Sequence, residues 1–177
     1  MIQTWESLLN GPAQVAAGSA YASSVTLTDV SPLPNTAIGA NSLVPGSVIR
    51  LTAFGVLSTT GTPTILLGFY YGGVAGTALA ATTAITTGSG VTNVPWRMEY
   101  QGIVRSVGAS GTIMGAGEVH LGTSVSAWTS YPLPQTAMAT VSIDTTTAKD
   151  VTVGAQWGTS SASNSLVCHA ILVESVA

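Results

Sequence analysis

The alternation of apolar and polar residues along this chain predicts β-strands. It is clearest in two stretches, WRMEYQGIVR (residues 96–105) and TIMGAGEVHL (residues 112–121). A period of two is typical of a strand that buries one face and exposes the other. Because a Gly-containing segment, Gly108–Gly111, separates the two stretches, we predict that they form a β-hairpin.

The apolar residues of this hairpin also predict its register. If apolar side chains face each other on the inner side, Tyr100 lies opposite Val119 and Met98 opposite Leu121. The same register places Glu99 opposite His120 on the outer side. Because a regular sheet face offers no pocket, we interpret that pair as a surface or interface ion pair rather than a general acid–base pair.

The most apolar part of the chain is the stretch Pro45–Tyr71, PGSVIRLTAFGVLSTTGTPTILLGFYY. Its two halves are rich in branched and aromatic residues, and the segment Thr59–Pro63 between them contains a glycine. This pattern predicts a second β-hairpin. The first half, Ser47–Ser58, carries apolar residues on both of its faces, so we expect a strand that is covered on both sides.

Four further stretches have strand character. They are Ser23–Val30, Ala137–Asp144, Val151–Trp157 and Ser165–Val176, with a weaker candidate at Thr77–Thr86. The segment Ser31–Val44 contains two prolines, a glycine and two asparagines, and the segment Gly122–Gln135 contains Pro132 and Pro134, so both are expected to be loops.

Eight or nine short strands without a helix longer than one turn predict an all-β fold. Such a pattern is typical of an antiparallel two-sheet β-sandwich, most simply a jelly-roll-like one. We divide the chain into an N-terminal arm, residues 1–20, and a sandwich domain, residues 21–177, because one core suits this length. The phase of the strands predicts a shared core of six residues, Trp96, Tyr100, Val119, Ile143, Val153 and Trp157.

Charged residues are unusually scarce. They make up 6% of the 177 residues, against roughly a quarter in an average soluble domain, and Lys149 is the only lysine. Lysine commonly protects exposed sheet edges from pairing with other chains. The composition therefore favours a protein that works inside a symmetric assembly. A net charge of −3 with four scattered basic residues argues against nucleic acid as a partner.

No catalytic, metal-binding or cofactor-binding motif is recognisable by spacing. The sequence lacks G-x-S-x-G, H-E-x-x-H, a phosphate-binding Gly-Lys-Ser/Thr and C-x-x-C. His120 and His169 each lack a second metal ligand at suitable spacing. We therefore predict no enzyme, no metal and no cofactor, although a Ser/His/Asp site could still assemble in space. Cys168 is expected to be a small buried residue in the last strand.

Export and membrane insertion are not expected. The N-terminal residues lack the basic region and apolar run of a secretion signal. The stretch Leu66–Ile85 is uncharged over 20 residues, but it has no basic flank and is dense in glycine and threonine. We expect no membrane partner.

Two groups of residues are candidates for binding. Trp128 and Tyr131 lie in the predicted Pro-rich loop and could face a ligand such as a sugar, the alternative being that they pack within the loop. In the arm, Trp5, Leu8 and Leu9 form an apolar cluster that water disfavours. We expect this cluster to contact a neighbouring protein.

The order of these strand phrases resembles a family of phage virion structural proteins from tailed phages of actinobacteria. The phrases are PGSVIRLTAFGVLSTTGTPTILLGFYYGG, VPWRMEYQGIVRSVGASGTIMGAGEV, DVTVGAQWG and HAILVES, within Ser42–Ser175. The resemblance implies a jelly-roll-like homotrimer on the virion, assembled in the host cytoplasm, and it supplies no catalytic residue. It fits a decoration protein bound to the major capsid protein on the outer capsid surface. A tail-associated protein or receptor-binding tip is the alternative, and a depolymerase is a third possibility.

Overall fold

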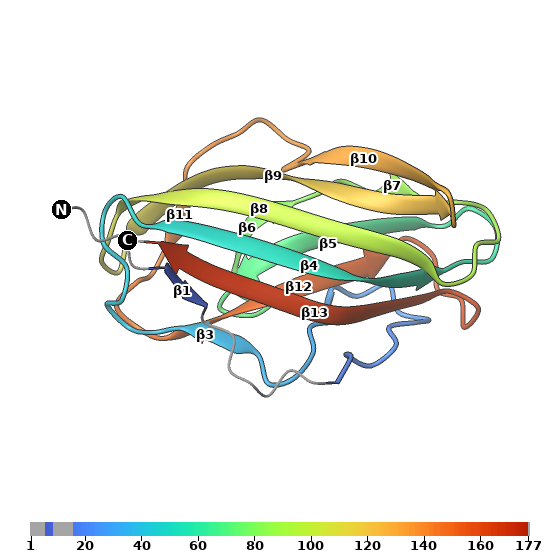
Figure 1. The fold of residues 1–177 in the computed structure, drawn as a ribbon, viewed down its shortest axis with the longest axis horizontal. Coiled ribbons are helices and arrows are strands. Elements are labelled where there is room, and N and C mark those ends of the chain that lie inside the picture. Colours follow the sequence, from blue (N-terminus) through green and yellow to red (C-terminus); the bar gives the residue numbers. More distant parts are fainter. Residues whose placement is uncertain (1–5, 9–15, 177) are drawn as a thin grey trace.

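The computed structural model describes residues 6–8 and 16–176, and this part of the chain folds into two packed β-sheets (Figure 1). Every pairing between named strands is antiparallel. The predicted all-β, antiparallel two-sheet sandwich is therefore confirmed. Eight strands have five residues or more, and five others have only two or three.

The first sheet contains the longest strands, which lie in front in Figure 1. In spatial order they are β1 (Glu6–Leu8), β13 (Ser165–Val176), β4 (Val48–Ser58), β8 (Val94–Ser106), β9 (Gly111–Ser124) and β10 (Ala127–Leu133). A short strand, β11 (Val141–Ile143), also pairs with β9. The observed β13 has the bounds predicted from the sequence.

The second sheet lies behind the first and is smaller. Its order is β2 (Thr28–Asp29), β12 (Lys149–Trp157), β5 (Thr64–Tyr71) and β6 (Thr77–Ala81). Two short strands extend it, since β3 (Thr36–Ile38) pairs with β12 and β7 (Ile85–Thr86) pairs with β5. The predicted loop 31–44 thus contains a short strand, and the predicted strand 23–30 is limited to β2.

The core lies between the two sheets and is formed by alternate residues of the long strands. All six predicted core residues are at most 2% exposed, namely Trp96, Tyr100, Val119, Ile143, Val153 and Trp157. The inward phase read from the sequence is therefore confirmed for β8, β9 and β12. In the predicted strand 137–144 only β11 forms, and the residues before it, 137–140, are exposed.

The stretch 45–71 is not a hairpin. Its two halves, β4 and β5, belong to different sheets, since β4 pairs with β13 and β8 whereas β5 pairs with β12, β6 and β7. The glycine-containing segment between them carries the chain from one sheet to the other. Inward residues of both halves then meet across the core instead of along one sheet.

The β8–β9 hairpin forms as predicted, but its register differs by two residues. Met98, and not Tyr100, lies opposite Val119, and Tyr100 lies opposite Gly117. A register irregularity between Val104 and Ser106 shifts the pairing near the turn. Because the shift is even, inward and outward faces are unchanged. Tyr100 thereby lies opposite a residue with no side chain.

The predicted loop 122–135 is largely strand. β9 extends to Ser124, and β10 follows after a tight turn and pairs with it along its length. β10 is the last strand of its sheet (Figure 1). Proline is tolerated at such an edge because an edge strand leaves N–H groups without a ladder partner. The prolines that suggested a loop are thus compatible with a strand here.

The N-terminal segment follows β13 along its free side. β1 pairs with the end of β13, the N–H of Gly18 donates to the carbonyl oxygen of Cys168 at 2.8 Å, and Tyr21 pairs with Leu166. The described parts of the predicted arm therefore lie on the chain's own sheet.

Candidate functional site

Charged side chains gather on the outer face of the first sheet, which is the face turned away from the core. Alternate residues of β4, β8, β9 and β13 project there. The group comprises Arg50, Arg97, Glu99, Glu118 and Glu174. Few charged residues are available in this chain, so their concentration on one face distinguishes it from the rest of the described surface.

One row of side chains crosses this face from β4 to β10. The strand register places Phe54 opposite Arg97, Arg97 opposite His120, and His120 opposite Ser130. Neighbouring strands are about 4.8 Å apart, so these side chains lie within reach of each other.

His120 has a polar partner at each of its two ring nitrogens. Its Nδ1 lies 2.8 Å from the hydroxyl oxygen of Ser130, and its Nε2 lies 3.1 Å from Oε2 of Glu118. A neutral ring satisfies both contacts if Nε2–H donates to Glu118 and the Ser130 hydroxyl donates to Nδ1. The predicted Glu99–His120 pair is wrong, because the register places Arg97 opposite His120 and Glu99 opposite Glu118. Glu99 forms an ion pair with Arg97 instead.

The structure thus brings a serine, a histidine and an acid together, as the sequence analysis left open. The order of contacts resembles that of a hydrolytic triad with the two ring nitrogens exchanged. However, the Glu118 side chain is 62% exposed, Ser130 is exposed, and the His120 side chain is 31% exposed. Electrostatic stabilisation of a reaction is strong only where water is excluded. This arrangement favours binding over nucleophilic catalysis.

Trp128 lies beside His120 on the same outer face. The ring centroids are 6.2 Å apart and the ring planes meet at 80°, so the two rings form a corner. Together with Arg97 they line a shallow hollow of about 300 Å³. Trp128 itself is 49% exposed.

Trp128 and Tyr131 do not share a ligand-facing surface. Trp128 is opposite Gly122 and Tyr131 is opposite Val119, and positions three apart in a strand project from opposite faces. Tyr131 packs against the hydrophobic core. If residues 127–133 had been recognised as a strand, the alternation of its side chains would have predicted that Trp128 and Tyr131 project from opposite faces.

An apolar patch occupies the other side of the same face, over β4 and β13. Val167 lies opposite Val56, and Ala170 lies opposite Phe54. Phe54 is 43% exposed, and Leu172, further along β13, is 39% exposed. We call these five residues the β4–β13 patch. The sequence predicted that the Ser47–Ser58 strand would be covered on both sides, but within the described chain only its inner face is buried.

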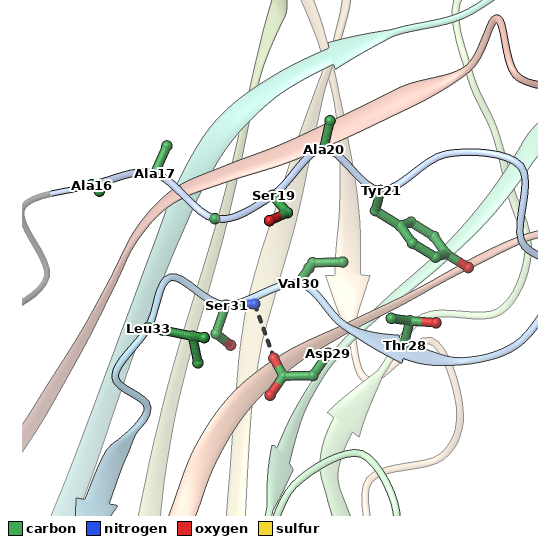
Figure 2. Close-up of a pocket in the computed structure, with 11 residues that line it drawn as sticks. Ala16, Ala17, Ser19, Ala20, Tyr21, Thr28, Asp29, Val30, Ser31 and Leu33 are labelled. Carbon is green, nitrogen blue, oxygen red and sulfur yellow. Dashed lines mark hydrogen bonds between the residues drawn. The ribbon is translucent and has the colours of Figure 1, made fainter.

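Another hollow, with a volume of about 440 Å³, lies between the segment 16–21 and the segment 28–33 (Figure 2). Its wall consists mostly of small and apolar residues. The one carboxylate in it, Asp29, accepts hydrogen bonds from the N–H of Ser31 at 2.9 Å and from Nδ2 of Asn35 at 3.0 Å. Both carboxylate oxygens of Asp29 therefore stabilise the local turn.

The remaining predicted residues have the following places. Cys168 is buried, as predicted, and burial raises the pKa of its thiol to about 12. His169, beside it, is exposed. Trp5 and Leu9 lie outside the described residues and only the backbone of Leu8, in β1, is described. The partner-binding role of this cluster stays a prediction.

The described residues contain neither a metal-binding cluster nor a membrane-spanning helix. No group of three or more His, Cys, Asp or Glu side chains is placed to hold a metal ion in residues 6–8 and 16–176. The same part of the chain has no helix with the length and apolarity that a membrane span requires.

Comparison with known proteins gives no relative. No protein-family model, curated protein or solved structure matches this chain.

Proposed function

We propose that this protein is a virion structural protein, a jelly-roll-like subunit that forms a homotrimer and decorates the outer capsid surface. The proposal places it on the major capsid protein of a tailed phage, as the resemblance of its strand phrases implies. Its biochemical role is then to associate, with itself and with the capsid, and not to catalyse a reaction.

The β4–β13 patch is the observation that carries this proposal. Single exposed apolar residues are normal on a protein surface, but a contiguous apolar patch with a polar rim is typical of a protein interface. Val56 lies opposite Val167 on the neighbouring strand, and Phe54 lies two residues from Val56 on the same face of β4. Arg97 and Glu99, on the next strand, supply the polar rim.

The charge distribution of the same face supports self-association. Arg50, on β4, lies opposite Glu174, on β13, so both signs of charge are present beside the β4–β13 patch. A symmetric interface brings copies of such a surface together with opposite charges available on each side.

The oligomeric state tests the first part of the proposal. Sedimentation equilibrium of the purified protein at micromolar concentration should give a trimer. The double variant Phe54→Ser and Leu172→Ser should sediment as a monomer with an unchanged circular dichroism spectrum. Val125→Ser is the matched control, since Val125 is 82% exposed but lies in the β9–β10 turn, and it should remain a trimer. A monomeric wild-type protein would contradict the proposal.

The location on the virion requires a separate measurement. Quantitative mass spectrometry of purified particles should find this protein in a fixed, high ratio to the major capsid protein. Only a few copies per particle would instead assign it to the tail. Purified particles that contain none of the protein would contradict a virion role.

The half-exposed Trp128 favours a second candidate, a tail-associated or receptor-binding tip protein. Tryptophan exposed beside hydrogen-bonding side chains is common at binding surfaces because the ring supplies a large contact area at low entropic cost. The copy number described above distinguishes this candidate from the capsid role.

A further inference from the structure

We propose that the hollow between Trp128, His120 and Arg97 binds a neutral sugar ring. The inference is independent of where the protein resides on a particle, and it concerns the ligand of one surface site. It rests on the shape of the hollow, the chemistry of its walls and the charges around it.

The shape of the hollow suits a small ligand. Its volume of about 300 Å³ is at the lower end of the range of about 300–1,000 Å³ that is usual for small-molecule sites. Two aromatic rings at 80° provide walls in two directions, so a ligand can contact a ring face with one side and polar groups with its rim. A pyranose ring has this division, with C–H groups on its faces and hydroxyls around its edge.

The polar groups around the hollow are positioned before any ligand binds. Ser130 and Glu118 fix the His120 ring through contacts of 2.8 and 3.1 Å. The ion pair with Glu99 fixes the Arg97 guanidinium. Preorganised groups lose little conformational entropy on binding, which favours affinity. Arg97 still has N–H groups to donate, and the Glu118 carboxylate and the Ser130 hydroxyl still have lone pairs to accept, as a ring of hydroxyls requires.

The charges near the hollow select against other ligands that stack on tryptophan. A nucleobase in a nucleic acid would bring phosphates close to Glu99 and Glu118, without the basic groove that such ligands need. A cationic ligand would be repelled by Arg97. It would also find only one tryptophan in this hollow, whereas cation recognition commonly uses a cage of several aromatic rings. A sugar acid would compete with Glu99 for Arg97. A neutral sugar meets none of these penalties.

Titration calorimetry with purified protein tests the proposal. The probes are glucose, galactose, mannose and N-acetylglucosamine, with glucuronic acid as the charged comparison. At least one neutral sugar should bind and should shift the indole N–H resonance of Trp128 in NMR spectra while leaving that of the buried Trp157 unchanged. Trp128→Ala should weaken binding at least about tenfold.

A second variant and a control keep the test independent of folding effects. His120→Ala should also weaken binding, whereas Val107→Ala, at a 42% exposed position in the β8–β9 turn, should bind as the wild type does. Failure of all four neutral sugars to bind would overturn the proposal. Tighter binding of glucuronic acid than of every neutral sugar would overturn it as well, as would unchanged binding by Trp128→Ala.

Discussion

Trp96 lies directly opposite Gly55 in the neighbouring strand, and its indole nitrogen lies 3.2 Å from the carbonyl oxygen of Val167 one strand further on. The absence of a side chain at position 55 lets the large ring cross β4 and donate this hydrogen bond to β13. A Cβ built on Gly55 would lie 2.9 Å from the indole nitrogen and would overlap the Val167 carbonyl. The contact ties together β13, β4 and β8.

The first prediction concerns this contact. Gly55→Ala should lower the free energy of unfolding by about 1–3 kcal/mol, because the added methyl group forces Trp96 and the β13 backbone to move. Chemical denaturation measures the change. Gly39→Ala is the control, because the nearest atoms to a Cβ at position 39 would be 3.8 Å away. The free energy of unfolding of this variant should change by less than about 0.5 kcal/mol. Equal effects of the two variants would contradict the packing described here.

The second prediction concerns Trp157, which is fully buried and whose indole nitrogen lies 3.3 Å from the carbonyl oxygen of Tyr21. Trp157→Ala should reduce stability by about 3–5 kcal/mol because it leaves a large cavity. Trp128→Ala, at a half-exposed position, should cost less than about 1 kcal/mol. Urea unfolding of both variants tests this, and a loss below about 1 kcal/mol for Trp157→Ala would mean that β12 does not bury this face.

The alternation of side chains was sufficient to predict the fold class and the core. A period of two determines which residues face inward, and this held for Trp96, Val119 and Trp157. Register is a different property, since a shift by two residues preserves both faces. The irregularity between Val104 and Ser106 and the glycine opposite Tyr100 set the observed register, and neither follows from the apolar pattern.

The pairing of strands was less predictable than the strands themselves. Two apolar strands joined by a short glycine-containing segment form a hairpin or cross between sheets, and local sequence does not distinguish these outcomes. β4 and β5 cross, so Phe69 meets Tyr100 across the core at a ring distance of 6.5 Å.

The candidate site was partly predictable. His120 and Trp128 were both singled out, but their proximity depends on β10 being a strand. Pro132 and Pro134 indicated a loop, and only the pairing of β10 with β9 brings Trp128 and Ser130 to His120.

The third prediction concerns acid stability. The hydroxyl and the N–H of Thr146 donate to the Asp144 carboxylate at 2.6 and 2.9 Å, and these hydrogen bonds lower the pKa of Asp144, with smaller contributions from Thr147 and Lys149. A lowered folded-state pKa contributes stability that is present above the unfolded-state value and lost as pH falls through the folded-state value.

Urea midpoints measured from neutral to acidic pH test this. The wild type should lose the Asp144 contribution on the acid side, and Asp144→Asn should show a smaller dependence on pH there. Thr146→Val removes the largest cause of the shift and should move the Asp144 pKa towards its ordinary value in an NMR titration. An unchanged pKa in that variant would assign the shift to other groups.

The fourth prediction concerns the Tyr100 hydroxyl, which is buried and has no hydrogen-bond partner among the described residues. Burial raises the pKa of Tyr100 to about 12. Because a buried polar group without a partner costs about 1–3 kcal/mol, Tyr100→Phe should raise the free energy of unfolding by about 1 kcal/mol at neutral pH. The raised pKa adds stability that is complete below the unfolded-state value and is lost as pH rises towards about 12. The advantage of the Phe variant should therefore grow in alkaline solution.

Tyr21→Phe provides the matched contrast, because the Tyr21 hydroxyl lies 2.8 Å from the carbonyl oxygens of Ser24 and Thr26. Loss of that hydrogen bond should reduce stability by about 1 kcal/mol. Opposite signs for the two Tyr→Phe variants in urea unfolding would establish that the register places the Tyr100 hydroxyl over glycine in a site without an acceptor. Destabilisation by both variants would instead mean that the Tyr100 hydroxyl has a hydrogen-bond partner. That partner would have to lie beside Gly102 and Gly115, which are next to the hydroxyl.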